Sequence, residues 1–278
     1  MTMPLPSVRG RSLHGHLRAV AAVNERGDTF LREQSFRAPL HVSKPHHEAG
    51  ALVVNLVSPT AGLFDGDEVD VAVVVEAGAR VVLTTPCASR IHRARTERAA
   101  VLRQELTVEA GGFAEYFPEL LIPQQGARYH QQTTLRVEHG GTLLFFEWLA
   151  PGRVAAGETF AYTELQWDTD LWHGGTLVAR ERYTLRPEGH HLASLRTVHE
   201  ASHYLGCFIV GDLAFPQEAI EHLGSDDVTV GCGPLATPGS WTIKALCRDN
   251  LAARRTLATL RSLVYQALGA EMPALRRF

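Results

Sequence analysis

The chain has 278 residues, 45% of them hydrophobic, and a formal net charge of −3 at pH 7. Because it has no excess of basic side chains to neutralise phosphates, nucleic acid is excluded as its main partner. A membrane-spanning helix is not expected, since no apolar run approaches the roughly 20 residues that one needs, and the N-terminus lacks the apolar core of a signal peptide.

The first part of the chain predicts short β-strands separated by turns. Strands are expected at residues 15–23, 29–37, 40–43 and 51–57. Residues 46–48, His-His-Glu, are expected to form a polar loop between the last two of these strands.

The middle of the chain repeats a strand, a glycine turn and a second strand. The unit VEAGA at residues 75–79 returns at 108–112 and 137–141, and more loosely at 171–177, in steps of 33, 29 and 34 residues. Such periods suggest units that stack because none can bury its apolar face alone. An ordinary antiparallel sandwich whose hairpins share a glycine turn is the alternative. In either case we expect a β-hairpin at residues 69–85.

After Pro187 the pattern becomes mixed. A short helix is expected at residues 216–223, with proline in its first turn and glycine just past its end. A strand follows at 242–246. A longer helix is expected at 250–268, with Asp249 as its N-cap.

These elements predict a single domain over residues 1–278 that is mostly β. Serial β-hairpins form a helical or stacked two-sheet structure over residues 15–186. A mixed β/α part, residues 187–278, contributes about two α-helices near the C-terminus. Arg261 lies off the apolar stripe of the longer helix.

Two acidic residues occupy the same position in successive repeats. Glu147 lies ten residues after Val137, and Glu181 lies ten residues after Leu171. Burying a carboxylate is costly unless it is paired, hydrogen-bonded or bound to a metal. If the repeats stack, the two carboxylates fall in register on one side of the assembly and are candidates for a functional row. The alternative is salt bridging by the arginines that are close in sequence, Arg153, Arg180 and Arg182.

Other candidate ligands are fewer. Asp67 follows the glycine turn of the first repeat, and Cys87 and His92 flank a loop where they could be soft metal ligands. A buried small side chain is the more ordinary role for a cysteine. The four cysteines form no Cys-x-x-Cys pair, so a reducing, cytoplasmic compartment is expected. No nucleotide-binding or hydrolase motif is present, and no catalytic residue is assigned.

Three sequences follow one another along the chain: SPTAGLFDGD at residues 58–67, LTTPCASR at 83–90 and PGRVAAGETF at 151–160. They resemble the signature stretches of the urease accessory protein UreD family, also called UreH. The N-terminal strands and the C-terminal helix of that family are similar to residues 26–42 and 247–268. The resemblance therefore spans nearly the whole chain, in order.

The resemblance implies a mostly β fold with few helices and a scaffold that is not an enzyme. Such a scaffold binds apo-urease and recruits UreF and the GTPase UreG, and its expected assembly with UreF is a dimer of heterodimers. It holds no permanent cofactor, and Ni²⁺ passes through it in transit. The resemblance places Asp67, Glu147 and Glu181 in that passage, with Cys87 and His92 as possible additional residues.

A second class of function remains open at this point. A glycosidase-like hydrolase with a β-fold would also use two carboxylates, as its acid/base pair. Such an enzyme should carry exposed aromatic side chains around a cleft, yet only 8% of the residues are aromatic. We therefore favour the urease maturation scaffold.

Overall fold

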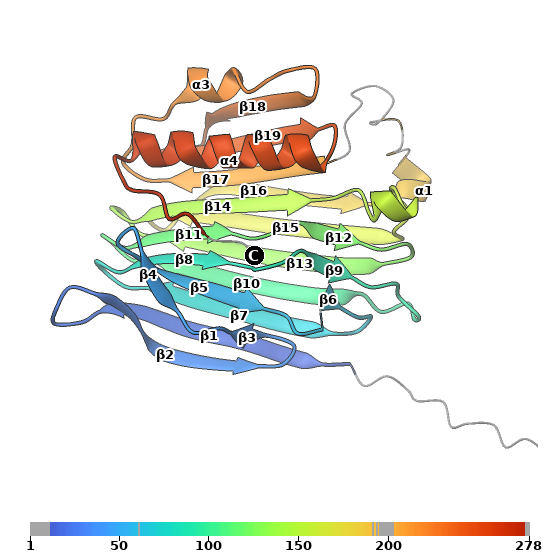
Figure 1. The fold of residues 1–278 in the computed structure, drawn as a ribbon, viewed down its shortest axis with the longest axis horizontal. Coiled ribbons are helices and arrows are strands. Elements are labelled where there is room, and N and C mark those ends of the chain that lie inside the picture. The colour runs from blue at the N-terminus through green and yellow to red at the C-terminus, as the bar shows by residue number, and fades with distance from the viewer. Residues whose placement is uncertain (1–11, 61, 191, 193, 195–202, 276–278) are drawn as a thin grey trace, which may run out of the picture.

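The computed structural model describes residues 12–60, 62–190, 192, 194 and 203–275. Two β-sheets pack face to face, and helix α4 (Asn250–Ala267) covers the outer face of the larger sheet toward one end (Figure 1). One apolar core fills the space between the sheets, and a second lies between the larger sheet and α4.

Within the described residues the smaller sheet has 7 strands, in the spatial order β16 (Thr176–Leu185), β15 (Glu164–His173), β13 (Arg128–Val137), β10 (Ala100–Val108), β7 (Glu68–Val75), β1 (His14–Val23) and β2 (Thr29–Arg37). The larger sheet has 12 strands, with the main path β18 (Val228–Pro234), β19 (Ser240–Cys247), β17 (His203–Val210), β14 (Thr142–Leu149), β11 (Phe113–Phe117), β8 (Arg80–Thr84), β5 (Ala51–Val57) and β3 (His41–Val42). Its remaining strands are β4 (His46–Glu48), β6 (Gly62–Leu63), β9 (Ser89–Ile91) and β12 (Leu121–Pro123).

The repeat units are arches that join the two sheets. β7 pairs in parallel with β1 and β10 in the smaller sheet, whereas β8 pairs in parallel with β5 and β11 in the larger one. The glycine turns of successive arches stack, because the N–H of Gly78 donates to the carbonyl of Gly111, and the N–H of Gly111 to that of Gly140. These three glycines have φ of 77°, 76° and 82°, a conformation that side chains disfavour.

The predicted stacked two-sheet structure is confirmed, but the hairpin expected at residues 69–85 is wrong. A glycine turn between two strands serves a hairpin and an arch equally well, so the turn does not distinguish them. In the arch, Val73 and Val75 of one strand share a core with Val81 and Leu83 of the next. A hairpin would put both strands side by side in one sheet, where neither could cover the apolar face of the other.

Hairpins do occur at both ends of the smaller sheet. β15 and β16 pair antiparallel around Gly174 and Gly175, whose φ values of 54° and 79° suit a tight hairpin turn. β1 and β2 form the other hairpin, as the sequence predicts. The polar loop expected at residues 46–48 is instead the short strand β4, because its backbone pairs with β5 although its side chains are polar.

The α-helices of the described residues lie toward the C-terminus: α1 (Pro187–His190), α3 (Gln217–Glu221) and α4, preceded by the 3-10 turn η1 (Val154–Ala156). α3 and α4 are the two expected helices. Asp249 caps α4 as predicted, accepting a 2.8 Å hydrogen bond from the N–H of Ala252. In the described ranges, no helix combines the length and the apolar character needed to cross a membrane.

Arg261 of α4 is buried, although its position off the apolar stripe suggests otherwise. Its guanidinium binds both carboxylate oxygens of Glu115 on β11 and, at 2.7 Å, the carbonyl of Pro273. The hydroxyl of Tyr265 donates to the same carboxylate at 2.7 Å. A buried ion pair therefore ties α4 to the middle of the larger sheet.

Candidate functional site

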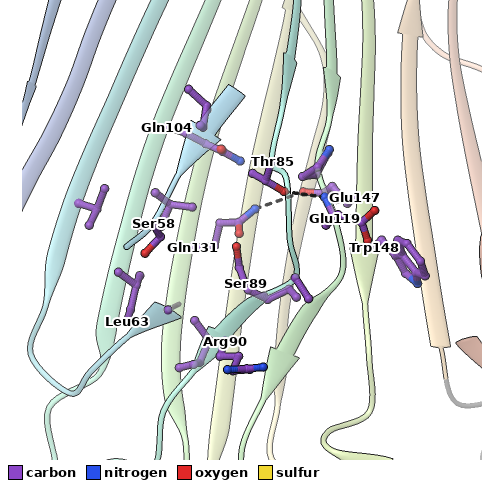
Figure 2. A pocket seen from close by; sticks show the side chains of 18 of the residues that line it. Ser58, Leu63, Thr85, Ser89, Arg90, Gln104, Glu119, Gln131, Glu147 and Trp148 are labelled. Atoms are coloured by element: carbon purple, nitrogen blue, oxygen red, sulfur yellow. Dashed lines mark hydrogen bonds between the residues drawn. The ribbon is translucent and has the colours of Figure 1, made fainter. Parts of the chain in front are cut away.

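Glu147 is a buried carboxylate between the two sheets. Side chains alternate along β14, so Glu147 faces the smaller sheet together with Phe145 and Leu149. Its Oε1 accepts a 2.7 Å hydrogen bond from Trp167 Nε1. The same oxygen accepts a 3.4 Å hydrogen bond from Gln131 Nε2 (Figure 2). Its Oε2 is buried and has no hydrogen-bond partner among the described residues. One oxygen of this carboxylate is thus held, and the other is available.

The protonation of Glu147 is set mainly by burial. Loss of hydration raises the pKa of Glu147 to about 7, and the negative charge of Glu181 pushes in the same direction. The positive charge of Lys244 and the hydrogen bond from Trp167 oppose this rise. Glu147 therefore exchanges its proton near neutral pH.

This pKa predicts a pH-dependent stability. Because the folded protein binds the proton of Glu147 more tightly than the unfolded chain does, the stabilisation is complete at low pH and is lost as pH rises through about 7. Between about pH 5.5 and about pH 8, the free energy of unfolding should fall by about 2 kcal/mol relative to Glu147→Gln. Denaturant titrations of both proteins across this range would measure the difference, and parallel curves would refute it.

Glu147 and Gln131 border a cavity of about 130 Å³ between the sheets, which we call the Glu147 cavity (Figure 2). Its walls are largely apolar, and the polar groups on them include Ser58, Ser89 and Arg90. Cys87 also lines the cavity and is exposed. The sequence candidates Glu147 and Cys87 therefore share one cavity.

Glu181 lies on β16 of the opposite sheet, where its Oε2 is 2.7 Å from Lys244 Nζ. Both residues line a second hollow of about 560 Å³, which also includes Tyr162, Tyr183 and Tyr204 and which we call the tyrosine hollow.

Aromatic rings connect the two spaces. The ring of Tyr183 stacks on Trp167, the donor to Glu147, and its edge meets the ring of Tyr204. The hydroxyl of Tyr183 is buried and has no hydrogen-bond partner within the described residues. Packed aromatic side chains therefore lie between the Glu147 cavity and the tyrosine hollow.

Glu147 and Glu181 both lie near Lys244. They do not lie in register on one side of the stack, as their equal positions in successive repeats predict. Ten residues beyond Val137 the chain has crossed an arch into the larger sheet, whereas ten beyond Leu171 it has turned back within the smaller sheet. The two carboxylates therefore approach from opposite sheets. The nearby arginines bind elsewhere: Arg153 pairs with Glu158, and Arg180 and Arg182 pair with Asp170.

Asp67 and His92 lie together at another place, the turn around Phe64. Asp67 is 3% exposed, and its two carboxylate oxygens accept hydrogen bonds from the N–H groups of Leu13 and Phe64 at 2.8 and 2.9 Å. The ring of His92 stacks on Phe64, and its Nε2 is buried without a hydrogen-bond partner among the described residues. Neither residue lines the Glu147 cavity or the tyrosine hollow.

Sequence reasoning missed Lys244, Trp167 and the tyrosines of the hollow. The sequence did indicate Lys244, because it is the one charged residue within the strand Ser240–Cys247 and one of only two lysines in the chain, with Lys44. Trp167 and the tyrosines gave no signal, because aromatic side chains in strands are ordinarily core residues. The described residues hold no group of three or more His, Cys, Asp or Glu side chains that could hold a metal ion.

Comparison with known proteins agrees with the sequence resemblance. The family model described as UreD urease accessory protein matches residues 13–278. The chain belongs to this family. The urease accessory protein UreD of Opitutus terrae is 35% identical to the chain, over 91% of this chain and 94% of the relative.

More distant relatives carry the same names. UreD of Acetivibrio thermocellus is 28% identical over 86% of this chain and 93% of its own. The urease accessory protein UreH of Helicobacter hepaticus is 25% identical, over 82% of this chain and 88% of its own. Membership of the UreD family supports a role in urease maturation, together with other maturation proteins. Because the family is described as one of accessory proteins, membership points to a non-catalytic role and away from a glycosidase-like hydrolase.

Proposed function

We propose that the chain is a urease maturation scaffold that passes Ni²⁺ through its interior to apo-urease. The observation that carries the proposal is the buried, unpartnered Oε2 of Glu147 on the wall of a cavity. A buried carboxylate oxygen without a donor is costly in a purely structural role. It is well placed, by contrast, to bind a cation that arrives without its full hydration shell.

The donor set suits a cation in transit. Carboxylate, phenol and amide oxygens hold a divalent transition metal less tightly than thiolates or a cluster of imidazoles do. Glu147 and Glu181 offer carboxylate oxygens on the two spaces, and Tyr183 and Tyr204 lie close enough to both for the two negative charges to raise the pKa of each tyrosine, after the larger effect of burial. Cys87 adds an exposed thiol on the wall of the Glu147 cavity.

The partners in the proposal are apo-urease, UreF and the GTPase UreG, with a dimer of heterodimers built through UreF. Nickel is cargo and not a resident cofactor, no catalytic residue is involved, and the site of action is the cytoplasm. These statements rest on the family assignment. Of the sequence candidates, Glu147 and Glu181 carry the passage, since Asp67 binds backbone N–H groups instead.

Replacing Glu147 by glutamine tests the passage, because glutamine keeps the shape of the side chain and the acceptor for Trp167 but removes the charge. With urease matured by the complete accessory set, we expect the nickel content per urease to fall about tenfold, the usual scale for loss of a metal ligand or its support. The scaffold should remain folded and should still co-purify with UreF and urease.

Glu105→Gln is the matched control, because Glu105 is an exposed carboxylate that pairs with Arg136 on the outside of the same β-sandwich. It should leave the nickel content unchanged. Normal nickel loading with both Glu147→Gln and Glu181→Gln would refute the passage, and loss of co-purification would place the defect in assembly instead.

A further inference from the structure

Three neighbouring strands place Glu147, Gly206 and Lys244 in one row across the larger sheet. Gly206 of β17 pairs with Glu147 of β14 on one side and with Lys244 of β19 on the other. Directly paired residues project toward the same face of a sheet. Both charged side chains therefore point toward the smaller sheet, and the position between them, Gly206, contributes no side chain.

The missing side chain at Gly206 lets Glu147 Oε2 and the edge of the Tyr204 ring approach the backbone closely. A β-carbon at position 206 would lie 3.1 Å from Glu147 Oε2 and 2.9 Å from the hydroxyl oxygen of Tyr204. These two oxygens therefore border the same small space. The backbone of Gly206 does not itself require glycine, since its φ lies outside the positive range. Glycine is required at position 206 because a side chain there would collide with Glu147 and Tyr204.

Lys244 brings a positive charge to this space. Its ammonium lies 2.7 Å from Oε2 of Glu181, which reaches over from the smaller sheet, and 4.5 Å from the centroid of the Phe208 ring. The side chain is 31% exposed and borders the tyrosine hollow, so it has space into which it can swing. The chain has only two lysines, Lys44 and Lys244. An ammonium is a compact point charge on a flexible stem and is released more readily than a forked guanidinium.

We propose that the ammonium of Lys244 is a tethered counter-ion, which a divalent cation displaces when it passes between Glu147 and Glu181. The inference rests on the proposed nickel passage and adds the residue that controls it. Two carboxylates that approach from opposite sheets need a positive charge near them, and Lys244 supplies it. A divalent cation would serve both carboxylates better, and its charge would repel the ammonium into the tyrosine hollow.

The exchange has a direct consequence for release. When the cation moves on, the ammonium returns to Glu181 and restores the charge balance. The site then holds the metal less tightly than two free carboxylates would, because each binding event must also break the Lys244–Glu181 ion pair. Lys244 thus lowers the affinity of the passage for its cargo.

The wild-type protein gives the first test. We expect Ni²⁺ at saturating concentration to raise the rate at which an amine-acylating reagent modifies Lys244 about fivefold, the factor that corresponds to freeing a partly exposed ion pair. Lys44, which is exposed and lies on the connection before β4, is the internal control and should react at an unchanged rate. Peptide mass spectrometry separates the two, and addition of a chelator should reverse the effect. An unchanged or lower rate at Lys244 would overturn the proposal.

Variants give the second test, with Ni²⁺ binding to the purified chain measured by calorimetry at one pH. Lys244→Met keeps the apolar stem and should bind about tenfold more tightly. Gly206→Ala should bind about tenfold more weakly, because its β-carbon would displace Glu147 Oε2 and the Tyr204 hydroxyl from their places. Gly231→Ala is the matched control, since Gly231 pairs with Lys244 on its other side and a β-carbon there meets nothing within 4 Å.

The outcomes separate this inference from the passage itself. If Glu147→Gln abolishes binding while Lys244→Met binds like wild type, the counter-ion role is wrong and the passage stands. If the wild type binds no Ni²⁺, or if Glu147→Gln binds as well as wild type, both are wrong. Should Lys244→Met fail to fold, Lys244→Gln replaces it, and the acylation test needs no variant at all.

Discussion

Replacing Arg261 with alanine is expected to lower the free energy of unfolding by about 3–5 kcal/mol, because it strands a buried carboxylate. Glu115 is fully buried on β11, and Arg261 on α4 is 4% exposed. Without the guanidinium, Glu115 keeps only the hydroxyl of Tyr265 as a hydrogen-bond donor from α4. The helix would then lose its polar anchor to the sheet in addition to one buried side chain.

Arg255→Ala is the control, since Arg255 lies on the same helix and is exposed. Chemical denaturation of both variants would measure the difference. The double variant Glu115→Gln with Arg261→Met should recover part of the loss, because no unpaired charge remains. A single variant Arg261→Ala within about 0.5 kcal/mol of wild type, the usual range for surface changes, would contradict the anchoring role.

Asp67→Ala is expected to cost about 3 kcal/mol of stability, since hydrogen bonds to a charged group contribute about 1.5–3 kcal/mol each. The carboxylate of Asp67 holds the N–H groups of Leu13 and Phe64 and so joins the start of β1 to the turn before β7. Asp70→Ala, at an exposed carboxylate of β7, should change stability little.

The same variant decides what Asp67 does. We expect urease matured with Asp67→Ala to carry normal nickel per folded scaffold molecule, because its oxygens already bind backbone N–H groups. Nickel content is to be measured beside the amount of folded protein. A loss of nickel without a loss of stability would return Asp67 to the passage.

Local patterns in the sequence were enough to predict individual elements. The strand expected at residues 51–57 is β5 (Ala51–Val57), and the capped helix expected at 250–268 is α4 (Asn250–Ala267). β-branched runs, turn glycines and an N-cap aspartate act through neighbours a few residues away, so the sequence shows them directly.

The sequence does not show in this way which distant segments pair with one another. Whether a repeat unit forms an arch or a hairpin depends on which apolar strand faces have to be covered. The same alternation of apolar and polar residues along the strands fits both. The Glu115–Arg261 pair joins residues 146 positions apart, and Lys244 and Glu181 are 63 apart. A single sequence does not show such partners, so Arg261 was assigned to the polar side of its helix and Lys244 was not noticed.

The candidate site was predictable only in part, for a related reason. Glu147 stands out because a charge within the apolar strand Thr142–Leu149 has to be explained. Its neighbours Trp167 and Gln131 arrive from other strands and are individually unremarkable. The acidic residue Asp67 gave an equally clear signal, but backbone groups of the N-terminal strand and its own turn take up both of its oxygens.

The stacked arches have a consequence for self-association. A parallel stack of this kind can grow indefinitely, since each arch offers the next one the same open backbone edge, and fibrils form in that way. Here the smaller sheet ends in antiparallel hairpins whose outer strands are charged: β2 carries Arg32, Glu33 and Arg37, and β16 carries Arg180 and Arg182. Another copy that approached either edge would have to strip water from these charges. Charged hairpins therefore close both edges of the smaller sheet and disfavour the addition of a further copy there.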